Sequence, residues 1–156
     1  MGFQIKVLAI YKKDVFFELE IQRYLSLILH YADLEIIRIN SFYSSNRTTK
    51  EILEGERKSV LSKIPKNSYC VALSEDGKIP KGSINFAKWL NKFRSFTSPV
   101  VFIIGGAYGL SEDLKKSCAE VLSLSPLTFQ HKLCLVILLE QIYRALTIIN
   151  NHPYHK

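Results

Sequence analysis

The chain has 156 residues, of which 47% are hydrophobic and 12% aromatic, enough for a packed core. This length fits one domain over residues 1–156, since domains typically have about 100–200 residues. No stretch approaches the ~18 uninterrupted apolar residues of a membrane span. The first residues also lack the pattern of a cleavable signal. We therefore expect a cytoplasmic protein without a membrane segment.

The charge balance favours a polyanionic partner. The 21 Lys and Arg residues exceed the 14 Asp and Glu residues, which gives a net charge of +7. In a small protein such an excess most often indicates nucleic-acid binding. The basic residues are spread along the chain and form no tail, so we expect a basic face on a folded domain.

The three cysteines are Cys70, Cys118 and Cys134. Their number is odd, and the chain contains no C-x-x-C motif and no Cys/His spacing that suits a metal. We interpret them as reduced core residues of a cytosolic protein, in preference to a metal or redox role. No metal is expected.

Apolar periodicity predicts strands that alternate with helices, which indicates an α/β domain with a mostly parallel sheet. The run at 100–104 is apolar throughout and predicts a strand that is buried on both faces. Strands are predicted at residues 3–10, 34–40, 68–73 and 100–104. Helices are predicted at residues 14–31, 48–63 and 83–96, after Ser111, and from residue 133 onward.

Start signals support several of these helices. Asp14 and Ser111 are suitable N-caps, and Thr48 and Glu51 have the spacing of a capping box.

Two polar segments are predicted to form loops. Residues 41–48 are the best candidate for a mobile loop, and residues 74–82 form a turn-rich connection.

The strand at 100–104 ends in a glycine loop, Gly105-Gly106-Ala107-Tyr108-Gly109. A strand, a glycine loop and a helix start are the parts of a ligand site at the carboxyl end of a parallel strand. The loop lacks the Lys-Ser/Thr of a P-loop and the spacing of G-x-G-x-x-G. A second neutral loop follows at residues 123–131, and the pair would suit a flat, partly apolar ligand such as a nucleoside. The alternative is a tight strand-to-helix turn.

The last helix is apolar at every position from Leu133 to Leu139. A helix on the outside of a sheet needs only one apolar stripe. This helix is therefore either central to the fold or packed on a second subunit, and we favour a homodimer. Chain ends are frayed in most proteins. The final residues 152–156 nevertheless include a histidine and a tyrosine that could reach a neighbouring site.

Several segments together closely resemble the RlmH family over essentially the whole chain. They are EGER at 54–57, GGAYGL at 105–110, LSLSPLTFQH at 122–131, LLEQIYRA at 138–145 and PYHK at 153–156. The family comprises bacterial SPOUT-class methyltransferases that use S-adenosylmethionine (AdoMet) to methylate N3 of a pseudouridine in 23S ribosomal RNA. The resemblance implies a homodimer and a trefoil knot in the C-terminal part. The knot rests on the resemblance alone, because knots are nearly absent among folds.

The resemblance also implies where AdoMet binds. Backbone groups would read the adenine edge and apolar side chains would enclose the purine, although a packing or turn role is the alternative for each residue. The implied residues are Leu73, Gly105, Leu124, Ser125, Pro126, Leu127, Thr128 and Phe129.

Methyl transfer from AdoMet is largely a matter of proximity and orientation. The N3–H proton must also leave, which a base or a nearby cation would assist. The candidates are His131, Arg144, Tyr154, His155 and Lys156. In the family the tail is thought to approach the cofactor site of the partner subunit. We therefore expect Arg144, Tyr154 and His155 on the substrate side and assign no catalytic base; for His131, a role in fixing the helix start is the stronger alternative.

The chain departs from the family pattern at three positions. Gln130 replaces a proline, Leu135 replaces an arginine early in the last helix, and Tyr11 replaces a glycine after the first strand. Lys132 or another cation would have to replace that arginine if it contacts RNA. We expect methylation of 23S rRNA in assembled ribosomes. The alternatives are a SPOUT enzyme with another RNA target and a non-catalytic RNA-binding module with a vestigial AdoMet pocket.

Overall fold

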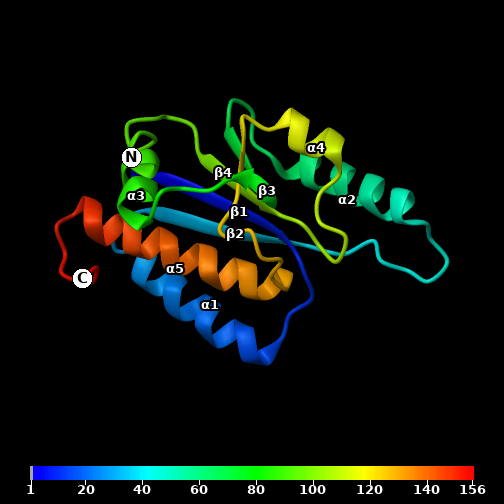
Figure 1. The fold of residues 1–156 in the computed structure, drawn as a ribbon, viewed down its shortest axis with the longest axis horizontal. Helices are drawn as coiled ribbons and strands as arrows, with labels where there is room; N and C mark the ends of the chain where they lie inside the picture. The colour runs from blue at the N-terminus through cyan, green and yellow to red at the C-terminus, as the bar shows by residue number, and fades with distance from the viewer. Residues whose placement is uncertain (1) are drawn as a thin grey trace.

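The computed structural model describes residues 2–156, and in them five parallel strands form one sheet with the order β2-β1-β4-β3-β5. The predicted α/β class and parallel sheet are confirmed (Figure 1). The elements are β1 (Gln4–Ile10), α1 (Val15–Ile28), β2 (Asp33–Ile39), α2 (Thr49–Lys63), β3 (Tyr69–Lys78), α3 (Ser83–Asn91), β4 (Val100–Ile104), α4 (Glu112–Ser117), β5 (Glu120–Leu122) and α5 (His131–Ile149).

Helices cover both faces of this sheet. Helices α1, α3 and α5 pack on one face, and α2 and α4 pack on the other (Figure 1). Strand β4 lies in the middle, and its residues alternate between two cores. Phe102 faces the larger core under α5, whereas Val101 and Ile103 face the core under α2 and α4. This position explains why the strand is apolar at every residue.

The three helix starts predicted from the sequence are confirmed. The Asp14 carboxylate accepts a hydrogen bond from the Phe16 N–H at 3.1 Å. Thr48 and Glu51 form a reciprocal capping box at the start of α2. Ser111 is the N-cap of α4 and accepts from the backbone of that helix. Local chemistry therefore fixes where these helices begin.

Strand β3 differs from its prediction, because it continues to Lys78 through residues expected to form a loop. The unpredicted strand β5 pairs with β3, and Leu122 lies beside both Leu73 and Lys78 across an irregularity. Gly77 permits this close pairing, because a Cβ there would lie 2.7 Å from the backbone of Val121. A three-residue strand carries too little periodicity to be recognised from sequence.

Helix α3 is shorter than predicted and ends at Asn91, well before Phe96. The N–H groups of Lys92 and Phe93 donate to carbonyls three residues back, at 3.2 and 3.1 Å. Such tight turns satisfy the final carbonyls of a helix without extending it. Phe93 continues the apolar spacing of the helix, so the sequence pattern placed the predicted end of the helix too late.

Helix α5 is central to the fold, which was one of the two alternatives for its apolar sequence. It packs between α1 and α3 (Figure 1). The side chains of Leu135, Leu138, Leu139 and Ile142 are fully buried within the single chain. The homodimer stays a prediction, as does the trefoil knot. Within residues 2–156, helices long and apolar enough to cross a bilayer are absent.

Candidate active site

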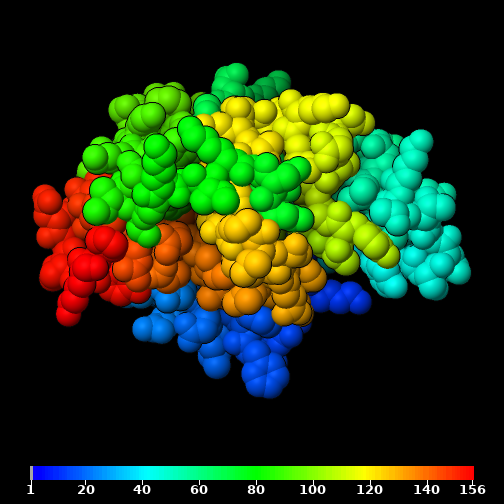
Figure 2. Space-filling model, in the orientation of Figure 1, coloured from blue at the N-terminus to red at the C-terminus, as the bar shows by residue number. Residues whose placement is uncertain are grey.

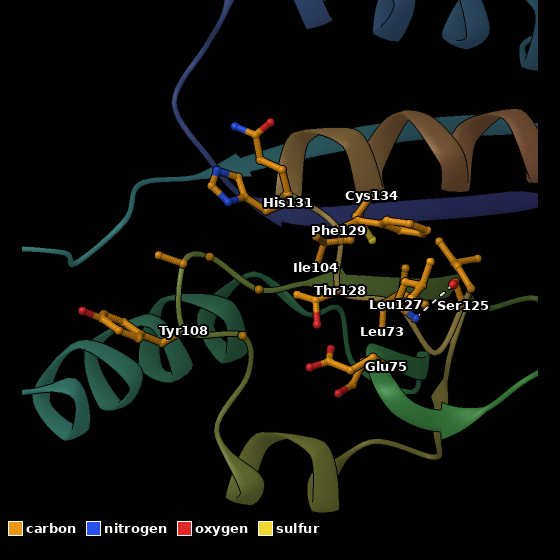
Figure 3. A pocket seen from close by; sticks show the side chains of 17 residues that line it. Leu73, Glu75, Ile104, Tyr108, Ser125, Leu127, Thr128, Phe129, His131 and Cys134 are labelled. Atoms are coloured by element: carbon orange, nitrogen blue, oxygen red, sulfur yellow. Dashed lines mark hydrogen bonds between the residues drawn. The ribbon is translucent and has the colours of Figure 1, made fainter.

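A cavity of about 600 Å³ opens at the carboxyl ends of β4 and β5, beside the middle of β3 (Figure 3). Its volume lies within the range of about 300–1,000 Å³ that is usual for small-molecule sites. Three segments line it: residues 73–75 in the middle of β3, the glycine loop, and the stretch from Leu124 to Cys134. Seven of the eight residues implied for AdoMet line this one cavity, and Pro126 does not. The seven are Leu73, Gly105, Leu124, Ser125, Leu127, Thr128 and Phe129.

The glycine loop folds back tightly on itself. The Gly109 N–H donates to the Gly106 carbonyl at 3.0 Å, and Gly109 adopts a left-handed conformation with φ 71°. A Cβ atom at Gly105 would lie only 2.4 Å from the Gly109 backbone. Only glycine fits at residue 105 without a shift of the loop, and the loop presents its backbone to the cavity.

The second loop is held by its own hydroxyl groups. The buried Ser123 hydroxyl donates to the Ser125 carbonyl at 2.8 Å. The Leu127 N–H donates to the Ser125 hydroxyl at 3.0 Å (Figure 3). These bonds form the local side-chain turns that serines favour. They fix the backbone that carries Thr128 and Phe129 along the cavity wall.

Apolar walls and a single carboxylate characterise the lining. Leu73, Ile104 and Phe129 supply apolar surface, and Glu75 is the one acidic residue among those that line the cavity. The side chains of Thr128 and Glu75 point toward one another (Figure 3). The sequence prediction missed Glu75, because it placed this residue in a turn-rich loop. Its position two residues after the predicted end of the strand was the available signal.

The first turn of α5 contributes His131 and Cys134 to the lining. Burial, and secondarily the charge of Lys132, holds the pKa of His131 below its usual value. The imidazole is therefore neutral at neutral pH and is able to accept a proton. Burial, with a smaller effect from Glu75, raises the pKa of the Cys134 thiol to about 11. Cys134 is thus a protonated, uncharged part of the wall.

The other predicted residues gather around Glu140, away from the cavity. Arg144 forms an ion pair with Glu140 at 2.6 Å, and the Tyr154 hydroxyl donates to the same carboxylate at 3.1 Å. The Arg144 guanidinium lies 4.8 Å from the centre of the Tyr154 ring and 3.2 Å from Nδ1 of His155. Burial, followed by Glu140, raises the pKa of Tyr154 to about 12.

This Glu140 cluster extends from the middle of α5 to the C-terminal tail, whereas the first turn of α5 lines the cavity. Arg144 follows Cys134 by ten residues, which corresponds to about 15 Å along a helix axis. Lys156 is exposed at the end of the chain, beyond this cluster. Within one chain, none of the predicted substrate-side residues lines the cavity, whereas His131 does.

The structure also shows where the three positions that depart from the family pattern lie. Leu135 is fully buried, so this position presents no side chain to a partner. Lys132 cannot simply replace an exposed arginine, because it pairs with Asp14 at 3.1 Å and is itself mostly buried. Gln130 lines the cavity, and Tyr11 is buried at the end of β1.

The cysteines are free and half-buried. In the part of the chain that the structure describes, clusters of three or more His, Cys, Asp or Glu residues that could hold a metal ion are absent.

Comparison with known proteins identifies the family. Residues 3–155 match the family model described as predicted SPOUT methyltransferase. Ribosomal RNA large subunit methyltransferase H from Pseudothermotoga lettingae is 34% identical over 97% of this chain and 99% of its own length. The protein of the same name from Dictyoglomus thermophilum is 39% identical over 97% of this chain and 98% of its own.

A solved structure supports the fold independently of these sequence matches. The SpoU methyltransferase AviRb from Streptomyces viridochromogenes, in complex with the cofactor AdoMet, has a TM-score of 0.50 and 15% identity. The match covers 97% of this chain and 60% of that one. The resemblance drawn from the motifs is thus confirmed, and the chain belongs to the RlmH family of SPOUT methyltransferases.

Proposed function

We propose that this protein transfers a methyl group from AdoMet to N3 of a pseudouridine in 23S rRNA, on assembled ribosomes in the cytoplasm. The cavity at the carboxyl ends of β4 and β5 and the middle of β3 carries the proposal, because the motifs typical of the family build its walls. The names of the two relatives, which describe methyltransferases of large-subunit ribosomal RNA, support the substrate class.

The residues of the cavity fit AdoMet. Its purine would lie between apolar side chains such as Leu73 and Phe129, with the backbone of both loops available for hydrogen bonds. AdoMet carries a positive charge on sulfur and another on its amino group, and Glu75 provides the matching negative charge. The absence of a side chain at Gly105 lets a ligand lie directly against the loop. When bound, AdoMet supplies an activated methyl group.

The chain itself must then orient the acceptor and receive a proton. Holding the N3 atom in line with the methyl group provides most of the acceleration. His131 is the one neutral imidazole that lines the cavity, and its lowered pKa keeps it unprotonated at neutral pH. We propose it as the proton acceptor. No other histidine lines the cavity in the described residues.

A homodimer would bring the Glu140 cluster to this cavity. The start of α1 exposes three apolar side chains, Val15, Phe16 and Leu19, at 74–87% of their surface. Such an exposed apolar patch is typical of an interface. It lies at the cavity end of α5, since Asp14 pairs with Lys132. Antiparallel pairing of two chains through this face would place Tyr154 of one chain near the cavity of the other.

A mixing experiment tests this shared site. Gly105→Ala impairs the cavity of one chain, and Tyr154→Ala removes the tail contribution of another. Each homodimer should transfer methyl groups much more slowly than the wild type. After co-refolding of equal amounts, about half of the dimers should be heterodimers, and in each of these one intact cavity meets one intact tail. The mixture should therefore recover up to about a quarter of wild-type methyl transfer. Mixed chains that are no more active than the two homodimers would show that each site is built within one chain.

A second candidate is a SPOUT enzyme with a different RNA target. Its support is Leu135, because the family has an arginine there and the buried leucine offers no contact. Mass spectrometry of the methylated nucleotide separates the two candidates. Label at any position other than N3 of pseudouridine favours the second.

A further inference from the structure

We propose that two stacked tyrosines, Tyr43 and Tyr108, together with a basic groove along α2, hold single-stranded RNA beside the cavity. This inference rests on the proposed function, because it assumes an RNA substrate. The groove has a volume of about 790 Å³, and its cations are Arg47, Lys50 and Lys58. Figure 2 shows the cyan segment that carries it next to the yellow-green segment around the glycine loop.

The tyrosine pair lies at the mouth of the cavity. Tyr108 belongs to the glycine loop and lines the cavity, but its ring points away from the centre toward α2 (Figure 3). It stacks on Tyr43 with 6.3 Å between ring centres and 30° between ring planes. Both rings are open to solvent, with 61% of Tyr43 and 48% of Tyr108 exposed. Exposed aromatic faces of this kind stack on unpaired bases with little regard to sequence.

The groove beside this pair has free positive charge. Arg47, Lys50 and Lys58 are exposed, and none of them forms an ion pair with a carboxylate within residues 2–156. The two acidic residues of the groove are already engaged. Glu51 accepts the Thr48 N–H of the capping box.

The other acidic residue, Glu54, binds Arg57 through two hydrogen bonds of 2.9 Å each. Lys50 and Lys58 lie eight residues apart on one helix, which corresponds to about 12 Å along its axis. Two cations at that separation can contact separate phosphates of one strand, and phosphate contacts fix the register of a nucleic acid.

The loop that carries Tyr43 is anchored, although its polar sequence predicted a mobile segment. The buried Glu56 carboxylate accepts from the Ser41 hydroxyl at 3.1 Å and from the Phe42 N–H at 3.2 Å. The Phe42 ring packs on the helix at Gly55, where a Cβ would lie 2.3 Å away. Arg47 lies over the same ring and donates to the Phe42 carbonyl at 2.8 Å. The surface is therefore formed before RNA arrives, which lowers the cost of binding.

Charge-matched variants test the groove. Binding to ribosomes that lack the modification is measured across salt concentrations for Lys50→Gln/Lys58→Gln and for the control Lys88→Gln/Lys92→Gln. The control removes the same charge from exposed lysines at α3, on the other face of the sheet. The groove variant should lower the slope of log affinity against log salt by about 1 to 2. Equal slopes for the two variants would overturn the role of the groove.

The tyrosine pair is tested by removing one ring. Tyr43→Ala should weaken ribosome binding by about 5- to 150-fold, the range expected for one stacked base. Tyr43→Phe keeps the ring and should bind as the wild type does. Phe96→Ala, which removes a ring that is 49% exposed elsewhere, is the control and should have no effect. AdoMet affinity should stay unchanged in all three variants.

Wild-type results distinguish the two proposals. If the wild type methylates ribosomes and Tyr43→Ala binds them equally well, the inference about the tyrosines fails and the proposed function stands. If the wild type neither binds nor methylates ribosomes while AdoMet still binds, the proposed function fails, and this inference fails with it.

Discussion

Gly105→Ala is the sharpest local perturbation of the candidate site. The added Cβ would lie 2.4 Å from the carbonyl carbon and oxygen of Gly109, whereas ordinary van der Waals contact begins at 3.4 Å. The loop must therefore open by about 1 Å. Overpacking of this kind costs about 1–3 kcal/mol of stability. A displacement of about 1 Å at a reacting centre can also lower the rate by about 100-fold.

Calorimetric titration with AdoMet measures the effect on the site, and urea denaturation measures the effect on the fold. We expect AdoMet affinity to fall by at least about tenfold, the equivalent of 1.4 kcal/mol. Gly109→Ala is the matched control in the same loop. No atom lies within 4 Å of its added Cβ, so it carries only the strain of a left-handed backbone, about 1–2 kcal/mol. Wild-type AdoMet affinity in folded Gly105→Ala would refute the assignment of the glycine loop to the cofactor site.

Three further predictions concern buried groups. Leu138→Ala should lower the free energy of unfolding by about 2–5 kcal/mol in urea, because this side chain is fully buried, whereas Leu133→Ala, 40% exposed, should cost less. Burial raises the pKa of both Cys118 and Cys134 to about 11, so iodoacetamide at pH 8 should modify them slowly until the chain unfolds; rapid labelling of the folded chain would contradict this. Burial also raises the pKa of Glu56, so ionisation of this carboxyl destabilises the fold as pH rises above about 4.5. Glu56→Gln should therefore gain stability relative to the wild type between pH 4 and pH 7, and a constant difference would argue against a raised pKa.

Much of the fold follows from local sequence signals. The strand at β4 is apolar at every residue because helices cover both faces of the sheet, and that run alone placed it correctly. The caps Asp14 and Ser111 fixed two helix starts, because each side chain binds a backbone N–H close in sequence. Signals of this kind need no knowledge of the rest of the chain.

Contacts between segments far apart in the sequence were not predicted. Strand β5 has only three residues, and it exists because β3 continues past Leu73 and offers an edge to it. The extension also carries Glu75 to the cavity, so the missed strand and the missed carboxylate have one cause. The stacking of Tyr43 on Tyr108 joins two loops 65 positions apart, for which the sequence contains no periodic signal.

The predicted site residues fall into two groups, those that meet in the cavity and those that do not. Those on the two loops next to strand ends came together in one cavity, because parallel strands end at a common edge. Arg144 and Tyr154 instead bind Glu140, which lies at the middle of α5. Within one chain, Arg144 and Tyr154 do not line the cavity. This separation from the cavity is the physical reason for proposing a site shared by two chains.

The most direct test of the proposed function is transfer of labelled methyl from AdoMet to ribosomes that lack the modification. The modified nucleotide would be identified by mass spectrometry, with free 23S rRNA assayed in parallel. We predict label on N3 of a pseudouridine, in ribosomes and not in free RNA. Absence of label despite measurable AdoMet binding, or label on a different nucleotide, would contradict the proposal.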